Sequence, residues 1–160
     1  MRARIVALVA LVALISGASG QEFQQFASTT GWYKTTDIDA GKDKLKLTLD
    51  SVELKGDTTF LVSFVDATDE VAKKPAGPRL DKVRDGNKGT NGKVIEDKEI
   101  EVGPEKYPGR DILIESPGGY IRNRAVIAGN RLYQVMVQGT KDVVTSPSAD
   151  KFINSFEITK

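Results

Sequence analysis

The stretch YPGRDILIESPGGYIRNRAVIAGNRLYQVMVQGTKDVVTSPSADKFINSF, residues 107–156, decides the fold of this chain. Its first apolar run, 112–114, stops at Ser-Pro-Gly-Gly, which is a strong turn signal. A second run, 120–128, reverses at Gly129-Asn130 into a third run, 131–138, and a two-residue Gly-Asn loop is typical of a type II′ hairpin. The stretch therefore predicts three consecutive antiparallel strands.

The Gly-Asn turn also predicts which side chains of this hairpin share a face. The cross-strand pairs expected on one face are Val126 with Tyr133, Arg124 with Val135, and Arg122 with Val137. On the other face we expect Ile127 with Leu132, Ala125 with Gln134, and Asn123 with Met136. Both faces contain apolar residues, which indicates a sheet that is covered at least in part on each side.

The end of the stretch has the marks of a short amphipathic helix. Ser146 suits the N-cap and Pro147 suits the first helical position. The residues of one apolar face, spaced i, i+3, i+4 and i+7, are Ala149, Phe152, Ile153 and Phe156. A helix of about ten residues is too short to be stable alone. We therefore expect it to dock on the sheet and to bury both phenylalanines.

The runs GRDILIESPGGYIRNRAVIAGNRLYQVMVQG and SADKFINSF resemble the C-terminal half of small exported bacterial proteins of uncharacterised function. Those proteins are similar in turn to the PsbP-like fold. The resemblance covers the last third of the chain well and residues 80–103 loosely. It implies an antiparallel sheet sandwiched by helices, an α/β/α sandwich, and it carries over no catalytic residue. We expect an α+β fold with one antiparallel sheet of about six to eight strands and two or three short helices packed against it.

Residues 1–20 have the pattern of a secretory signal peptide. Arg2 and Arg4 precede an unbroken run of 11 apolar residues, 5–15, and small residues follow at 16–20. The apolar run is too short to span a bilayer, which takes about twenty residues. We expect residues 21–160 to form a single globular domain that is exported to the periplasm or the extracellular space, with no stable membrane insertion after cleavage.

Composition excludes several classes of function. The chain has 23 basic and 22 acidic residues, and without Arg2 and Arg4 the numbers are 21 and 22, so no nucleic-acid partner is expected. It contains no His and no Cys, which excludes Ser-His-Asp and Cys-His catalysis and ordinary zinc sites. We predict no catalytic residue, no metal site and no cofactor.

Upstream of the decisive stretch the strand signals are weaker. A first strand is predicted from Trp32 to Asp37, followed by a loop at 37–43. Leucines alternate with polar residues over 45–49, after which the apolar phase shifts, and this predicts either a bulge or a change of face. The charged run 94–102 predicts an outer strand.

The segment 66–92 is polar and rich in glycine, and we expect it to be the most mobile part of the mature chain. Within it, residues 78–85 predict two helical turns, with Leu80 and Val83 facing inward and Gly86 closing the helix. The charged side of this helix is predicted to face a partner.

The candidate binding residues are Tyr120, Arg122, Arg124 and Tyr133. Guanidinium groups on rigid strands suit bidentate binding of a carboxylate or a phosphate. The alternative, which the pattern favours, is structural: the arginine stems cover the sheet, and Tyr120 or Tyr133 takes a cation–π contact.

These observations favour a soluble, non-enzymatic exported module that binds another envelope protein. The alternative is a carrier for a small apolar or anionic ligand, held between the sheet and the C-terminal helix. An enzyme is disfavoured, because no side chain of this sequence readily serves as a base near neutral pH.

Overall fold

The strands of the described chain form one antiparallel sheet, and short connections join all consecutive strands except the third and fourth, between which two helices lie. The computed structural model describes residues 34–40, 43–54 and 56–158. Its strands are β1 (Lys34–Ala40), β2 (Asp43–Leu54), β3 (Thr58–Asp66), β4 (Lys93–Val102), β5 (Tyr107–Ser116), β6 (Gly119–Ala128) and β7 (Arg131–Gly139). They form a seven-stranded sheet in the order β1-β2-β3-β7-β6-β5-β4, and every neighbouring pair is antiparallel.

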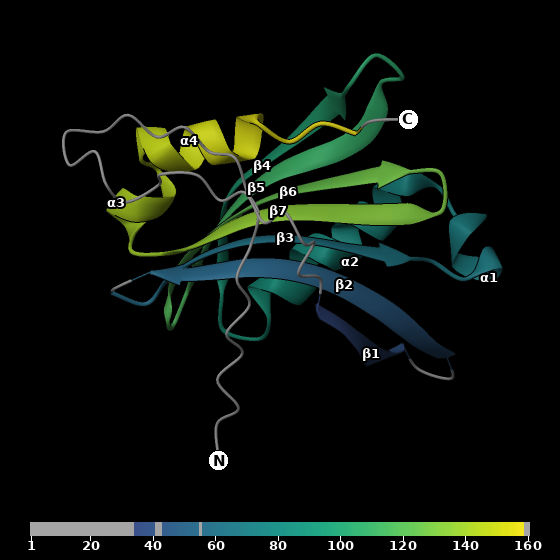
Figure 1. Ribbon diagram of the computed structural model, residues 1–160, viewed down its shortest axis with the longest axis horizontal. Coiled ribbons are helices and arrows are strands. Elements are labelled where there is room, and N and C mark those ends of the chain that lie inside the picture. The colour runs from purple at the N-terminus through teal and green to yellow at the C-terminus, as the bar shows by residue number, and fades with distance from the viewer. Residues whose placement is uncertain (1–33, 41–42, 55, 159–160) are drawn as a thin grey trace.

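Helices lie on both faces of this sheet (Figure 1). They are α1 (Asp69–Ala72), α2 (Ala76–Lys88), α3 (Lys141–Val144) and α4 (Pro147–Asn154). Helix α2 packs on β5 and β6 from one side, while α3 and α4 pack on β6 and β7 from the other. The α+β fold predicted from the sequence, an antiparallel sheet with short helices against it, is thereby confirmed. None of the helices in the described part of the chain is long and apolar enough to cross a bilayer.

The predicted hairpin has the predicted register. Val126 pairs with Tyr133, and Ile127 pairs with Leu132 on the opposite face. Gly129 begins the reversal with a φ of 63°, a conformation that a glycine adopts without strain. Because side chains alternate between faces, this register decides which residues of β6 and β7 meet α2 and which meet α4.

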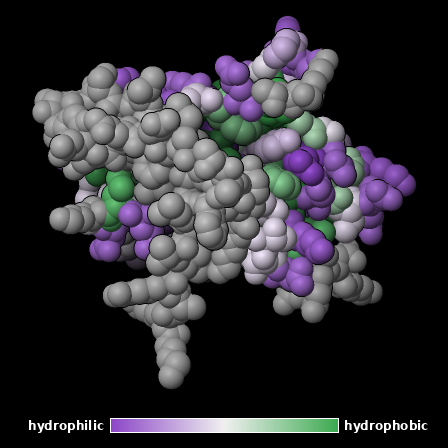
Figure 2. All heavy atoms as spheres, in the orientation of Figure 1, coloured by the Kyte–Doolittle hydropathy of each residue, from purple (hydrophilic) through white to green (hydrophobic). Residues whose placement is uncertain are grey.

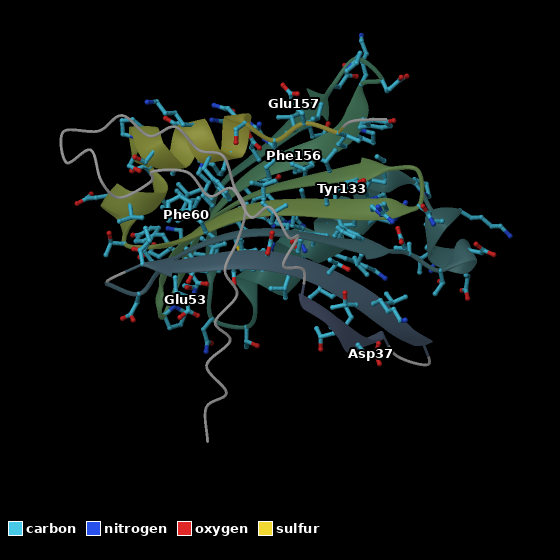
Figure 3. All side chains as sticks on the ribbon, viewed as in Figure 1. Asp37, Glu53, Phe60, Tyr133, Phe156 and Glu157 are labelled. Atoms are coloured by element: carbon cyan, nitrogen blue, oxygen red, sulfur yellow. The ribbon has the colours of Figure 1, made fainter. Side chains whose placement is uncertain are left out.

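The larger core lies between the sheet and the C-terminal helices. Phe152 is 2% exposed, and its ring meets that of Phe60 on β3 edge to face, with ring centroids 5.0 Å apart at 88°. Figure 3 shows Phe60 below these helices and Phe156 close to Tyr133. The expectation for Phe156 holds only in part. It lies beyond the end of α4 and is half-buried, 5.6 Å from the Tyr133 ring, because the helix ends before its fourth apolar position.

Helix α4 begins as the sequence predicts. The Ser146 hydroxyl accepts a hydrogen bond from the Ala149 amide at 3.2 Å, and Pro147 opens the helix. In the segment 66–92 the helix α2 is longer than predicted. It continues through Gly86 to Lys88 and ends at Gly89, whose φ of 59° disfavours other residues. Leu80 is buried and Val83 packs beside it, as predicted; the mobility of this segment stays a prediction.

Two further expectations for the N-terminal half are resolved. The predicted loop at 37–43 is wrong, because β1 extends to Ala40 and β2 begins at Asp43. Strand β2 pairs with β3 without interruption, so its apolar residues change face and no bulge is present there. Trp32 and Tyr33, and the leader 1–20, lie outside the described residues.

Phe152 should be the main anchor of the C-terminal helix. We expect Phe152→Ala to lower the free energy of unfolding by about 3–5 kcal/mol, because it leaves a cavity under α4. Lys151→Ala, at an exposed position of the same helix, serves as the control and should stay within about 0.5 kcal/mol. Urea unfolding measures both, and a loss below about 1 kcal/mol for Phe152→Ala would show that α4 is peripheral.

Asp50 predicts a pH dependence of stability. Its Oδ1 is buried and has no hydrogen-bond partner in the described part of the chain, and burial raises the pKa of this carboxyl above its ordinary 3.8. The folded chain therefore holds this proton more tightly than the unfolded chain does. Ionised Asp50 costs stability above the raised pKa, and this cost disappears as pH falls below 3.8.

Asp50→Asn should accordingly raise the urea midpoint at pH 7 and leave it unchanged near pH 3, roughly below the pKa of an ordinary Asp. Asp37→Asn, at an exposed position of β1, is the control and should shift the midpoint at neither pH. An equal midpoint for Asp50→Asn and the wild type at pH 7 would contradict the assignment.

Candidate functional site

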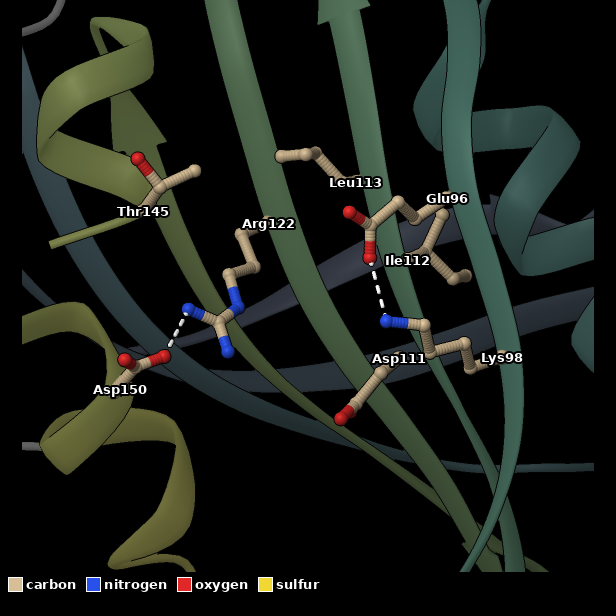
Figure 4. A pocket seen from close by; sticks show the side chains of 8 residues that line it. All are labelled: Glu96, Lys98, Asp111, Ile112, Leu113, Arg122, Thr145 and Asp150. Atoms are coloured by element: carbon tan, nitrogen blue, oxygen red, sulfur yellow. Dashed lines mark hydrogen bonds and ion pairs between the residues drawn. The ribbon is translucent and has the colours of Figure 1, made fainter. Parts of the chain in front are cut away.

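A cleft of about 260 Å³ lies between the outer strands of the sheet and the C-terminal helices (Figure 4). Its lining comes from β4, β5, β6, the residue after α3, and α4. The lining residues are Glu96, Lys98, Asp111, Ile112, Leu113, Arg122, Thr145 and Asp150. We call this site the charged cleft, because five of its eight residues carry a charge.

The wall of the charged cleft on β4 is an ion pair. Lys98 Nζ donates to Glu96 Oε2 at 2.8 Å, since residues two apart on a strand project from the same face. This hydrogen bond is the main cause of a raised pKa for Lys98 and a lowered pKa for Glu96. Both shifts move the pKa values further from neutral pH, so neither group is suited to exchange a proton at that pH.

Arg122 forms the opposite wall and connects the sheet to both C-terminal helices. Its Nη1 donates to Asp150 Oδ1 at 2.5 Å and to the carbonyl oxygen of Val144 at 3.4 Å. Val144 is the last residue of α3, where carbonyl groups lack partners within the helix. The guanidinium therefore satisfies a helix end and pairs with a carboxylate of the next helix at once.

Arg124 also connects the sheet to a C-terminal helix, and it pairs with its carboxylate through two hydrogen bonds. Its Nε and Nη2 donate to the two oxygens of Asp111 at 2.7 and 2.8 Å, a bidentate pair across β5 and β6. Its Nη1 donates to the carbonyl oxygen of Ile153, near the end of α4, at 3.2 Å. A cation at a helix C-terminus is favourable, so both arginines hold helices onto the sheet.

The structure places the four sequence-predicted binding residues on one face but does not bring them together. Tyr120 pairs with Gly139 at one end of β6, while Tyr133 pairs with Val126 near the other end. Six residues along a strand span about 20 Å. Only Arg122 of the four lines the charged cleft.

The tyrosines have cationic neighbours, but these are not the predicted arginines. Lys141 Nζ lies 6.0 Å from the Tyr120 ring centroid. The Arg131 guanidinium lies 4.2 Å from the Phe64 ring and 5.9 Å from the Tyr133 ring, and it also pairs with Asp66 at 2.7 and 2.9 Å. Arg122 and Arg124 use carboxylates and helix carbonyls in place of the rings.

The space between the sheet and α4, where a carrier would hold its ligand, is occupied by the chain itself. Phe152, Ile153 and Ala149 are at most 2% exposed and contact the buried side chains of β3 and β7. This interface is a packed core.

Part of the charge on α2 is paired with the sheet, while Lys82 and Asp85 of the same helix are exposed. Arg84 Nη1 lies 3.1 Å from Asp97 Oδ2 on β4 and 3.2 Å from Asp81 Oδ1 on its own helix. Arg110 on β5 bridges the same two carboxylates, at 2.7 Å to Asp97 and 2.9 Å to Asp81. Asp81 and Arg84 thus belong to a network that holds α2 to the outer strands, and a partner for the exposed charges of this helix stays a prediction.

Ile95 is a further candidate residue, which the sequence pattern did not single out. Pairing between β4 and β5 shifts between Val94 and Glu96, which leaves Ile95 as the extra residue of a β-bulge. Ile95 is 39% exposed. In the described part of the chain, Val71 is the only other large hydrophobic residue that is exposed. The available signal was the Val94-Ile95 pair, two consecutive apolar residues in a strand that is otherwise charged.

The two arginines should respond differently to lysine. Arg124→Lys should lower stability by about 1–3 kcal/mol, because one ammonium cannot replace a bidentate pair and a helix contact, and Asp111 stays partly buried. Arg122→Lys should cost less than about 1 kcal/mol, because its partner Asp150 is 52% exposed. Urea unfolding of both variants measures these losses of stability. Equal losses for Arg124→Lys and Arg122→Lys would contradict the different roles assigned to the two arginines.

No protein-family model matches the sequence, and no curated protein matches it significantly. The resemblance to PsbP-like proteins therefore stays a prediction, and function is argued from the arrangement of the side chains.

Proposed function

We propose that this chain is an exported, non-enzymatic module that binds another protein of the cell envelope through the outer edge of β4. We define the β4 edge by Ile95, Glu96 and Lys98, together with Arg122 and Asp150 across the charged cleft. The leader pattern of residues 1–20 supports export to the periplasm or beyond. The PsbP-like assignment belongs to the same proposal, and helices on both faces of an antiparallel sheet support it.

The observation that carries the proposal is the exposed Ile95 at the bulge. An isoleucine exposed by 39% on a strand is ordinary by itself. Here a break in the strand pairing leaves it as the extra residue of a bulge, and bulges recur where a strand re-aims a side chain for function. An apolar side chain on a rigid element, surrounded by charges, has the form of an interface anchor with a polar rim.

The charges of the β4 edge support recognition of a protein more than of a small ion. The β4 edge contains Glu96 and Asp150 as well as Lys98 and Arg122, so it offers both signs in alternation. Mixed charges on fixed elements favour a complementary protein surface and reject others. On the face of the molecule seen in Figure 2, the coloured hydrophobic side chains lie among hydrophilic ones.

Strand addition is a less favourable mode of binding at this edge. β4 is the last strand of the sheet, and its outer backbone side has no partner among the described strands. Its many Glu and Lys residues and its bulge are the devices by which proteins discourage edge pairing. We therefore assign the contact to side chains of the β4 edge.

The two other functions considered have less support. An enzyme that uses acid–base catalysis needs a group whose pKa lies near neutral pH. The pKa of Glu96 is lowered and that of Lys98 is raised, so both lie further from neutral pH than usual. A carrier needs space between α4 and the sheet, and Phe152 and Ile153 fill that space. The binding module needs neither.

Photo-crosslinking in native envelope extract tests the proposal. A photoreactive residue at position 95 should capture a protein that the same residue at position 71 does not. Val71, the matched control, is 37% exposed and lies on α1, away from the β4 edge.

The captured protein, once purified, should bind Ile95→Asp at least about tenfold more weakly than the wild-type chain, a loss typical of an anchor residue. Val71→Asp should bind like the wild type. Equal affinity of the wild type and both variants would overturn the assignment to the β4 edge, and urea unfolding would confirm that Ile95→Asp is folded.

A further inference from the structure

One edge of the Arg122 guanidinium has no hydrogen-bond partner among the described residues. The Nη1 atom donates both hydrogen bonds of this side chain, to Asp150 and to the carbonyl oxygen of Val144. The Nε and Nη2 atoms carry N–H groups that point the same way in the planar fork of a guanidinium. Within the described chain, Arg122 therefore supports the C-terminal helices with one nitrogen and leaves the edge formed by the other two open.

The two other arginines of this sheet face use the same edge for a carboxylate. Arg124 donates from Nε and Nη2 to the two oxygens of Asp111, at 2.7 and 2.8 Å. Arg131 donates from Nε and Nη2 to the two oxygens of Asp66, at 2.7 and 2.9 Å. Of these three arginines, Arg122 alone lacks a described carboxylate on this edge.

The open edge faces the charged cleft. Figure 4 shows the two other nitrogens of Arg122 on the side of the guanidinium turned away from Asp150, toward the Glu96–Lys98 pair. The side chain of Arg122 is 23% exposed, so the edge is accessible but partly shielded from water. An anion bound there gains more than it would on a fully exposed arginine, because the effective dielectric constant is lower.

Lys98 provides a second donor across the cleft. Its Nζ donates to Glu96 at 2.8 Å, and an ammonium group has three N–H groups to donate. The pKa of Lys98 is raised chiefly by this hydrogen bond, while the positive charge of Arg122 lowers it. The two cations are therefore close enough to act on one anion between them.

We propose that the charged cleft receives an acidic side chain of the partner protein, whose carboxylate binds Nε and Nη2 of Arg122 and accepts a further hydrogen bond from Lys98. This inference deepens the proposed function and rests on it, since both residues belong to the β4 edge. One carboxylate matches one open guanidinium edge. Phosphate recognition generally uses a cluster of arginines, and here Arg124 already holds Asp111.

The charges that line the cleft also favour a singly charged group. The lining has two cations and three carboxylates, and one of these carboxylates, Asp111, is paired with Arg124. The four remaining charges, two of each sign, sum to zero. A carboxylate adds one negative charge to this neutral set, whereas a phosphate monoester adds about 1.5 to 2. The smaller charge is repelled less by the two remaining carboxylates.

NMR of the arginine Nε–H groups in the purified chain tests the proposal. The probe is N-acetyl-aspartate amide, whose only charge is its side-chain carboxylate, and N-acetyl-asparagine amide at the same ionic strength is the matched control. The aspartate probe should shift the Nε–H signal of Arg122 and leave those of Arg124 and Arg131, whose edges are occupied. The asparagine probe should shift none of the three. Arg122→Lys keeps the charge and assigns the signal by removing it.

Two variants should change the affinity for the aspartate probe in opposite directions. Lys98→Gln removes a donor and should weaken binding about two- to fivefold, the range of an exposed ion pair. Glu96→Gln removes a competing negative charge and releases Lys98, so it should strengthen binding by a similar factor. The two side chains are 70% and 51% exposed, so both variants should stay folded.

Three outcomes of the titration would overturn the proposal. The first is an unshifted Arg122 signal in the folded chain. The second is a shift as large at Arg124 or Arg131, which would show a general effect of the probe. The third is a shift of Arg122 by inorganic phosphate at lower concentration than by the aspartate probe, which would assign the edge to a free phosphate.

The protein captured at position 95 separates this inference from the proposed function. Arg122→Lys should bind that protein at least about tenfold more weakly than the wild-type chain does. Weaker binding of Ile95→Asp with unchanged binding of Arg122→Lys would contradict the inference and leave the proposed function intact. If position 95 captures no protein, the proposed function fails, and a shift of Arg122 then assigns the edge to a free carboxylate in place of a partner's side chain.

Discussion

The packing of Phe152 on Phe60 is the interaction on which the rest of this structure depends. Helix α4 has only eight residues and would not persist alone. The edge-to-face contact, with ring centroids 5.0 Å apart, joins the helix to β3. Ile153 and Ala149 belong to the same core cluster as the buried valines of β7. Because α4 is held there, Asp150 stands across from Arg122, and the charged cleft has its second wall.

The arginines of β6 show how a sheet can hold short helices. Arg122 and Arg124 project from the face that α3 and α4 cover, and each donates both to a carboxylate and to a carbonyl oxygen at or near a helix end. A guanidinium does this well because its donors are arranged in a rigid fork. Free arginines on this face would be an anion site, whereas paired arginines are supports.

The outer strand β4 carries charges that discourage pairing with another chain, and it also exposes an apolar side chain. Its charges discourage pairing with another chain, and two of them, Glu96 and Lys98, satisfy each other. On the opposite face, Asp97 is held by Arg84 and Arg110, so the strand is fixed to both α2 and β5. The bulge at Ile95 sits on this rigid element. Ile95 is exposed there, and the proposed function assigns the contact with a partner to this position.

The sequence by itself determined the local features of this protein. The Gly129 turn, the alternation that follows it and the Ser146 cap act within a few residues, so the β6–β7 register and the start of α4 were predictable. The end of α2 was not, because Gly86 and Gly89 are both plausible stops and packing of the helix on the sheet selected the later one.

Only the tertiary structure decided the ion pairs and the exposure of Ile95. Arg122 and Asp150 are 28 positions apart, and Arg131 and Asp66 are 65 apart. No periodicity links such residues. Their pairing follows from strand order and from the side on which each helix crosses the sheet, and these depend on how the whole core packs. The bulge at Ile95 likewise depends on the pairing of β4 with β5, since a bulge exists only where the register between two strands shifts.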